Sequence, residues 1–191
     1  MKMAVTMEHR GPDANGVWVD RDVMFAHRRL SMIDISKEGE QPFHSSDGRY
    51  VTVFNGEIYN YRELRAELSG KGHRFTSQCD TEVLVHLYEE EGEQGVRRLR
   101  GMYAYALWDR NRQTLLLVRD RLGIKPLYYA PRGGGHAEAQ GVAFSSELPS
   151  LLEAVGTPSL APEAIYEYVT HLYVPSPSTV YHGIRHVMPG E

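Results

Sequence analysis

The chain has 191 residues, 41% of them hydrophobic, and we expect residues 1–191 to form one globular domain with a buried core. Its net charge of -4 and its scattered basic residues argue against a nucleic-acid-binding protein. A single cysteine, Cys79, excludes an internal disulfide. No apolar run approaches the roughly 20 residues of a membrane span, so we expect a cytoplasmic location and no membrane partner.

The first third of the chain predicts strands followed by a helix. Residues 17–36 are typical of two short strands around a turn. The stretch RYVTVFN predicts a strand that stops at a polar turn, because the Asn-Gly pair at Asn55 is a strong turn signal. A helix is expected from Tyr61 to Ser69, with Asn60 as its N-cap in a capping-box pattern.

The middle of the chain predicts a strand, a helix and a hairpin. HRFTS is typical of a short strand, and Asp80 then caps a helix whose apolar stripe ends before Gly92. The runs MYAYALW and TLLLVRD are apolar on both faces, which predicts a central antiparallel hairpin.

The last third predicts another hairpin and two helices. PLYYA and VAFSS form the hairpin, with residues 131–141 as its loop. ELPSLLEAV and PEAIYEYVT predict helices, the second starting at Pro162. The order of strands, helices, strands and helices indicates an α+β protein with layered sheets and helices outside.

Three short stretches carry groups that could bind a small polar ligand, although each also has a structural explanation. Arg28 and Arg29 point to opposite faces of a strand, so one of them is directed inward and needs an anionic partner. Asn55, Gly56 and Glu57 combine an amide, a backbone N–H and a carboxylate, or form an ordinary turn. Asp80 has a complete explanation as a helix cap.

Other reactive residue types are interpreted as structural. Cys79 lies beside a carboxylate, which disfavours a thiolate, so we interpret it as a packing residue. Asp120 is expected to form a salt bridge with a neighbouring arginine in a turn. The nine histidines show no convincing metal-ligand spacing, so the sequence predicts no metal site.

Taken together, these groups describe a pocket for a free α-amino acid with a side-chain carbonyl. Arg29 would hold the carboxylate through its planar guanidinium. Glu57 and Asp80 would hold the ammonium, and Asn55 with the Gly56 N–H would hold the carbonyl oxygen.

Seven motifs, in this order, resemble the glutamine-hydrolysing half of asparagine synthetases, which are class II glutamine amidotransferases. They are HRGPDANGVW, HRRLSMID, VFNGEIYNYRELRAEL, CDTEVLVHLYEEEG, LRGMYAYALWDR, RDRLGIKPLYYA and FSSELPSLL. The resemblance covers almost the whole chain, from Glu8 to Gly190.

The resemblance implies a fold, a reaction and partners. The fold would be the N-terminal-nucleophile hydrolase sandwich, two antiparallel sheets between helical layers. In this family an N-terminal cysteine attacks the glutamine amide, and the ammonia released travels to a synthetase domain that uses ATP and Mg²⁺. The resemblance implies that Arg29, Asn55, Gly56, Glu57 and Asp80 bind L-glutamine, with Asn55 and Gly56 stabilising the oxyanion.

The sequence departs from the family pattern at both ends. Family members begin Met-Cys-Gly, but no cysteine precedes Arg10 here, so we expect a domain that lacks its nucleophile and first strands. No synthetase domain follows Gly190, so we expect ATP and Mg²⁺ to bind elsewhere in the parent enzyme. The alternative is a non-catalytic glutamine-binding or docking module from a cysteine-free relative, similar to β-lactam synthetases. A helix is expected around Met3 and Met7. The isolated chain is expected to fold poorly or to self-associate, with a homo-oligomer as one outcome.

Overall fold

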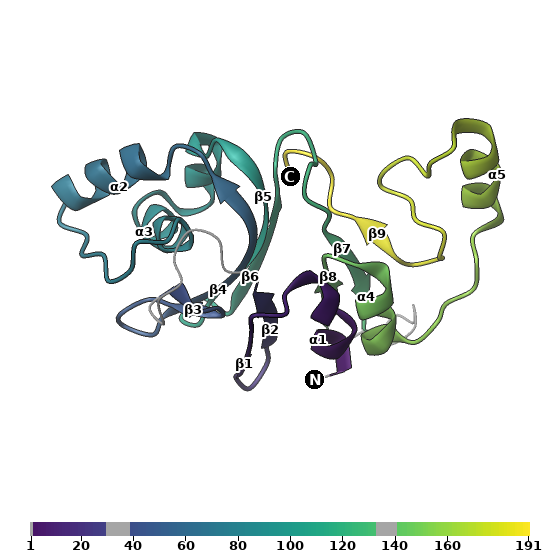
Figure 1. The fold of residues 1–191 in the computed structure, drawn as a ribbon, viewed down its shortest axis with the longest axis horizontal. Helices are drawn as coiled ribbons and strands as arrows, with labels where there is room; N and C mark the ends of the chain where they lie inside the picture. The colour runs from purple at the N-terminus through teal and green to yellow at the C-terminus, as the bar shows by residue number, and fades with distance from the viewer. Residues whose placement is uncertain (1, 30–38, 133–140) are drawn as a thin grey trace.

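The computed structural model describes residues 2–29, 39–132 and 141–191, and its elements form four layers (Figure 1). Helices α2 and α3 cover one face of a four-stranded sheet. A three-stranded sheet faces its other side, and helices α1 and α4 lie outside that second sheet (Figure 1). This arrangement confirms the predicted α+β class and its sandwich of sheets between helices.

The central sheet has the strand order β3-β4-β5-β6, and all its pairs are antiparallel. Its strands are β3 (Phe43–His44), β4 (Tyr50–Ile58), β5 (Gly101–Asp109) and β6 (Thr114–Arg119). The hairpin predicted from the two apolar runs is confirmed as β5 and β6. Only β5 is central, however, because β6 pairs with β5 alone within the described parts of the chain.

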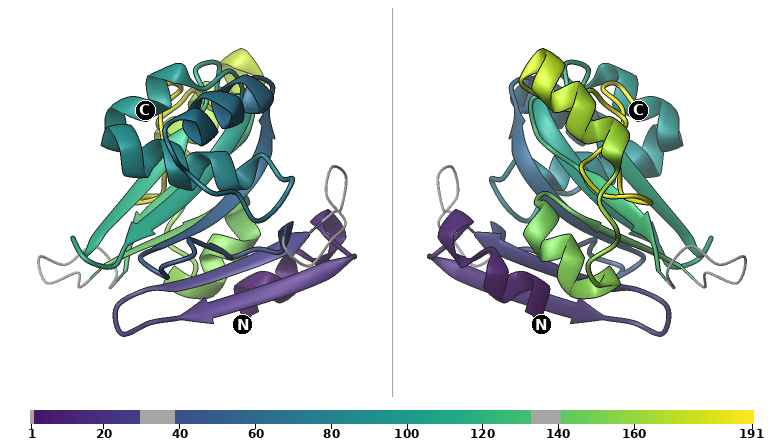
Figure 2. Two further views of the ribbon diagram at one scale, coloured as in Figure 1. Left: turned by 90° about the vertical axis from the view of Figure 1, so that its left-hand side faces the viewer. Right: turned by 90° about the vertical axis from the view of Figure 1, so that its right-hand side faces the viewer.

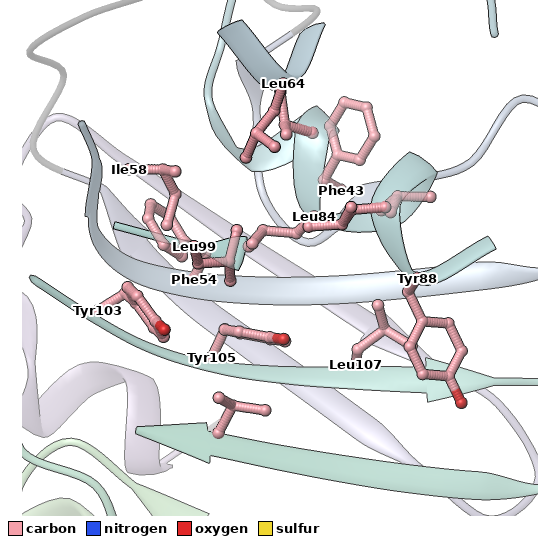
Figure 3. Packing of buried hydrophobic residues seen from close by; sticks show 14 of the residues in the cluster. Phe43, Phe54, Ile58, Leu64, Leu84, Tyr88, Leu99, Tyr103, Tyr105 and Leu107 are labelled. Atoms are coloured by element: carbon pink, nitrogen blue, oxygen red, sulfur yellow. The ribbon is translucent and has the colours of Figure 1, made fainter. Parts of the chain in front are cut away.

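The helical layer over this sheet consists of α2 (Tyr61–Gly70) and α3 (Thr81–Glu91), followed by the 3-10 helix η3 (Gly92–Arg98). Residues Thr81 to Tyr88 of α3 are all buried, so the predicted apolar stripe is part of a helix enclosed on every side. Figure 3 shows Leu64 and Leu84 from these helices facing Phe54 and Tyr105 of the sheet. This cluster is the larger of the hydrophobic cores between helices and sheet.

The opposite face of the central sheet is covered by strands from both ends of the chain. The hairpin of β1 (Ala14–Val19) and β2 (Met24–Arg29) packs Phe25 against Val51 and Val53 of β4. The second sheet has the order β8-β7-β9 and consists of β7 (Tyr128–Pro131), β8 (Val142–Ser145) and β9 (Arg185–His186). The two-residue strand β9 was not predicted, because it is too short to show a period.

The remaining helices lie outside the sheets. They are α1 (Lys2–Thr6), the 3-10 helix η1 (Glu8–Arg10), α4 (Leu148–Val155) and α5 (Pro162–His171). Helix α1 confirms the helix expected around Met3, and it lies beside the β1–β2 hairpin and α4 (Figure 2). Among the described residues, no helix combines the length and hydrophobicity needed to cross a membrane.

Several local predictions were wrong for physical reasons. Asn60 is not a side-chain cap; its amide nitrogen donates to the Arg98 carbonyl and its oxygen accepts from the Arg100 N–H. HRFTS is not a strand, since hydrogen bonds to a buried Glu82 hold Thr76 and Ser77 in a loop. The loop predicted at residues 131–141 and the end of the strand predicted at 17–36 fall partly outside the described residues.

The carboxylate of Asp120 was also predicted wrongly. Four backbone N–H groups donate to it, at 2.9 to 3.2 Å, from Tyr103, Leu122, Ile124 and Lys125. The neighbouring Arg119 donates instead to the carbonyl oxygens of Lys125, Gly123 and Val187. Main-chain amides therefore take the place of the expected salt bridge.

Candidate functional site

Asn55, Gly56 and Glu57 lie inside strand β4, not in a turn. They pair with Ala104, Tyr103 and Met102 of β5, and the pairing continues to Ile58. The predicted turn was therefore wrong: the strand runs through the Asn-Gly pair, and the chain turns at Tyr59 and Asn60. Strand position fixes where each of the three groups points.

Glycine is required at position 56 by a close approach between two strands. A Cβ there would lie 2.1 Å from the Met102 carbonyl oxygen and 2.6 Å from the Tyr103 Cα. Its φ of 155° also lies in a region that other residues rarely adopt. Gly101 faces the reciprocal constraint, with a Cβ 2.1 Å from the Glu57 carbonyl oxygen. The close packing of β4 against β5 is therefore enough to require glycine at position 56, independently of any role of its N–H in binding.

The Gly56 N–H points to the edge of β4 that faces away from β5. In an antiparallel pair, alternate residues direct their N–H groups outward. Two positions before, the Phe54 N–H donates to Gln41 Oε1 at 2.6 Å, and two positions after, the Ile58 N–H donates to Asp80 Oδ2 at 2.9 Å. Strand β3 ends its pairing at Thr52, so this part of the edge is bounded by side chains. The Gly56 N–H lies between them.

Asp80 closes one end of this edge. It directly precedes helix α3, but its carboxylate accepts from the Ile58 N–H in β4 rather than capping the helix as predicted. Burial raises the pKa of Asp80, and the negative charge of the nearby Glu57 raises it further. The structure therefore brings Asp80 together with the Asn55-Gly56-Glu57 segment.

Arg29 lies at the end of β2, and alternation places it on the same face as Phe25 and His27. That face packs on β4, where Phe25 contacts Val51 and Val53, and alternation places Asn55 and Glu57 on the face of β4 that these valines share. Arg28 lies on the other face of β2 and pairs with Glu8 at 3.0 Å. Alternation thus directs Arg29 toward β4, although the Arg28 side chain is also largely buried, and the convergence of all five residues on one ligand stays a prediction.

His27 is a candidate site residue that sequence reasoning missed. Its Nε2 lies 3.1 Å from the Phe54 carbonyl oxygen, next to Asn55, and a carbonyl can only accept, so Nε2 carries the proton. Burial lowers the pKa of His27 to about 4, and the charge of Arg29 contributes, so the ring is neutral at pH 7. Its Nδ1 is buried and has no hydrogen-bond partner among the described residues. The sequence does contain one indication of this: His27 lies two residues before Arg29, so on a strand both side chains lie on the same face.

Cys79 is confirmed as a packing residue. The side chain is buried, and burial raises the pKa of its thiol above the ordinary value. Ser77 Oγ lies 2.9 Å from its sulfur. A thiol in this environment is protonated at neutral pH and is a poor nucleophile.

Two polar cavities lie away from the predicted residues. One, of about 500 Å³, is lined by charged residues that include Asp20, Arg49 and Arg110. The other, of about 390 Å³, lies where Glu67 and Arg98 form an ion pair. Ion pairs between surface residues line both cavities, and neither lining includes a predicted site residue.

Comparisons with known proteins identify relatives over nearly the whole chain. Glutamine-hydrolysing asparagine synthetase 1 of Bacillus subtilis is 43% identical over 182 residues, covering 95% of this chain and 28% of that protein. The second B. subtilis enzyme of the same name is 46% identical over 149 residues, covering 78% and 19%. The chain thus spans between 19% and 28% of the length of these relatives.

A solved structure shows the same fold. Glutamine phosphoribosylpyrophosphate amidotransferase of B. subtilis superposes with a TM-score of 0.62 at 22% identity, over 81% of this chain and 40% of that one. The glutamine amidotransferase domain family matches residues 1–191, the full length of the chain. The resemblance inferred from the seven motifs is confirmed: this chain belongs to the glutamine amidotransferase domain family.

Proposed function

We propose that the β4 edge binds L-glutamine for an asparagine synthase that transfers the amide nitrogen of glutamine to aspartate. Arg29 holds the substrate α-carboxylate through paired hydrogen bonds. Glu57 and Asp80 hold the α-ammonium, and the Asn55 amide and Gly56 N–H receive the side-chain carbonyl oxygen. These roles use one anion receptor, two cation receptors and one pair of donors, which together match this amino acid.

The observation that carries the proposal is the outward Gly56 N–H beside the Asp80 carboxylate. When a nucleophile attacks an amide, the carbonyl oxygen becomes negatively charged. N–H donors that are already in position stabilise this charge. Pairing of β4 with β5 on its other edge fixes the direction of this N–H, so it is available without reorganisation. The Asn55 amide, on the preceding residue, supplies the second donor.

We infer that this chain binds glutamine without hydrolysing it alone. Covalent amide hydrolysis needs an activated nucleophile. The one cysteine among these residues is Cys79, whose burial raises its pKa, and it contributes a packing contact. Hydrolysis of a bound glutamine would therefore need a nucleophile other than Cys79.

Calorimetry with L-glutamine on this chain tests the proposal. We expect saturable binding in the micromolar to millimolar range, with L-glutamate much weaker because it places a second negative charge near Glu57 and Asp80. Asp80→Asn and Asn55→Ala should each weaken binding about tenfold or more. Asp22→Asn and Asn111→Ala, on exposed residues, are the matched controls and should bind like the parent chain.

Binding that survives both Asp80→Asn and Asn55→Ala would place the ligand elsewhere and overturn the assignment. Ammonia release by the unmodified chain at an enzymatic rate would overturn the inference about the nucleophile. Glutamine binding without ammonia release supports both statements.

A further inference from the structure

A cluster of two histidines and one glutamate lies between the loop after α2 and helix α3, outside the β4 edge. His73 Nδ1 lies 3.2 Å from His86 Nδ1. Glu89 Oε2 lies 3.5 Å from His73 Nδ1 and 3.6 Å from His86 Nδ1. His86 and Glu89 share one face of α3 because they are three residues apart.

The outer nitrogens of both rings face carboxylates. His73 Nε2 lies 3.1 Å from Glu90 Oε2, and His86 Nε2 lies 3.7 Å from Glu82 Oε1. A carboxylate accepts hydrogen bonds, so His73 Nε2 donates to Glu90, whereas His86 Nε2 lies at an ion-pair distance from Glu82. The two Nδ1 atoms and the Glu89 oxygen face one another within 4.8 Å, as three atoms that can each bind a metal ion. Either a proton shared between the two Nδ1 atoms or a metal ion can occupy their centre.

We propose that His73, His86 and Glu89 bind a divalent zinc ion. Zinc binds imidazole nitrogen and carboxylate oxygen at about 2.0–2.2 Å, which sets tetrahedral ligand separations of about 3.3–3.6 Å. Two of the observed separations, 3.5 and 3.6 Å, lie in this range, and the third, 3.2 Å between the two Nδ1 atoms, is slightly shorter. Water completes the fourth position.

The surroundings of the cluster suit a bound metal. Carboxylates on the second ring nitrogen orient metal-binding histidines and increase their basicity. The Phe75 ring packs edge-on against His86 at 4.5 Å between centroids, which fixes the imidazole. The histidine side chains are 12% and 10% exposed and Glu89 is 43% exposed, so an ion can enter from solvent past Glu89.

Binding would join two elements that the chain connects only loosely. His73 follows helix α2, and the other two ligands lie on α3. The loop between them carries Thr76, Ser77 and Asp80, so the ion would hold this loop against the helix. Spacing along the chain predicted no metal site because His73 and His86 are 13 residues apart.

The test uses the full chain, freed of metal with a chelator, and zinc chloride alone as the probe. Calorimetry should show one zinc ion per chain with micromolar or tighter affinity. NMR of the unmodified chain should show shifts of the His73 and His86 ring nitrogens on zinc addition, with His182 unchanged. Cobalt substituted for zinc should give visible absorption bands typical of a four-coordinate ion.

Variants separate the ligands from their neighbours. Glu89→Gln should weaken zinc binding tenfold or more, whereas Glu93→Gln, at an exposed position in η3, should leave it unchanged. Circular dichroism of each metal-free variant checks that it folds. The proposal is overturned if both variants bind zinc with equal affinity. It is also overturned if the His73 and His86 NMR signals of the unmodified chain do not change on zinc addition. In either case a proton shared between the two rings takes the place of the metal ion.

Discussion

Two aspartates, Asp80 and Asp120, are both almost fully buried, yet their pKa values shift in opposite directions. Burial raises the pKa of Asp80, because the Ile58 N–H and other nearby amides offset only part of the lost hydration. Burial also acts to raise the pKa of Asp120, but its four backbone N–H donors outweigh burial and lower it. The two carboxylates therefore have opposite effects on stability.

At Asp80, ionisation costs stability. Its folded pKa lies above the ordinary value of 3.8, so its contribution is present below pH 3.8 and is lost as pH rises through the folded pKa. Asp80→Asn keeps an oxygen for the Ile58 N–H and removes the charge. We expect this variant to melt at a higher temperature than the parent at pH 7, with each 1 kcal/mol gained raising Tm by roughly 2–4 °C.

Thermal melts at several pH values check this expectation, with Asp22→Asn as the control. The advantage of Asp80→Asn should disappear below pH 3.8, where both side chains are neutral in the folded and unfolded states. A variant less stable than the parent at pH 7 would contradict the pKa direction. A more stable variant that binds glutamine poorly would mean that Asp80 is retained for the ligand.

At Asp120 we expect the opposite result. The pKa of Asp120 lies below 3.8, so its stabilisation is present above pH 3.8 and is lost as pH falls through the folded pKa. Asp120→Asn places an amide nitrogen among four N–H donors, and we expect a cost of about 1–3 kcal/mol at pH 7. Urea unfolding at pH 7 and pH 3 measures it. A cost that is unchanged or larger at pH 3 would contradict the argument.

At the scale of elements, the loop between α2 and α3 depends on one buried carboxylate. Glu82 accepts hydrogen bonds from the N–H and hydroxyl groups of both Thr76 and Ser77, at 2.7 to 2.9 Å. Glu82→Ala would remove the acceptor of all four donors, and those of Ser77 are buried, so we expect a loss of about 2–4 kcal/mol. Hydrogen exchange should rise first in residues 73–80. Glu153→Ala, on the exposed face of α4, should change little in the same denaturant titration.

Periodicity predicted the elements whose side chains fill the core. Helix α3, the β5–β6 hairpin and the β7–β8 hairpin follow from apolar patterns, because burial of those faces decides their structure. The wrong predictions lie where tertiary hydrogen bonds outweigh local preference. Glu82 holds a loop where β-branched and aromatic residues favoured a strand. Pairing with β5 through Ile58 extends β4 across an Asn-Gly pair that locally favours a turn.

The sequence predicts which residue types belong to the candidate site, but not the directions in which their groups point. Sequence selected Asn55, Gly56, Glu57 and Asp80 as groups that suit an amino acid, partly through the family resemblance. The outward direction of the Gly56 N–H follows only from the strand register. Asp80 was predicted as a cap because its bond to Ile58 joins residues 22 apart in sequence. No local signal reveals such a contact.

At the scale of the whole molecule, helix α5 stands apart from the sandwich (Figure 1). Of its residues only Ala164 is buried. Tyr166, Val169 and the following Leu172 are 72%, 73% and 79% exposed, far more than apolar side chains in a folded core. Clusters of exposed apolar residues of this kind typically mark contacts between protein surfaces.

We therefore expect the isolated chain to self-associate through α5 at tens of micromolar concentration. The double variant Tyr166→Lys with Val169→Lys should sediment as a monomer, because two charges would have to be buried in the contact. Glu163→Lys in the same helix changes the net charge by the same amount, +2, and removes no apolar group, so it should still associate. Sedimentation velocity distinguishes the two. If Glu163→Lys also abolishes association, general charge repulsion rather than the apolar face controls it, and if the double variant still associates, the contact lies on another surface.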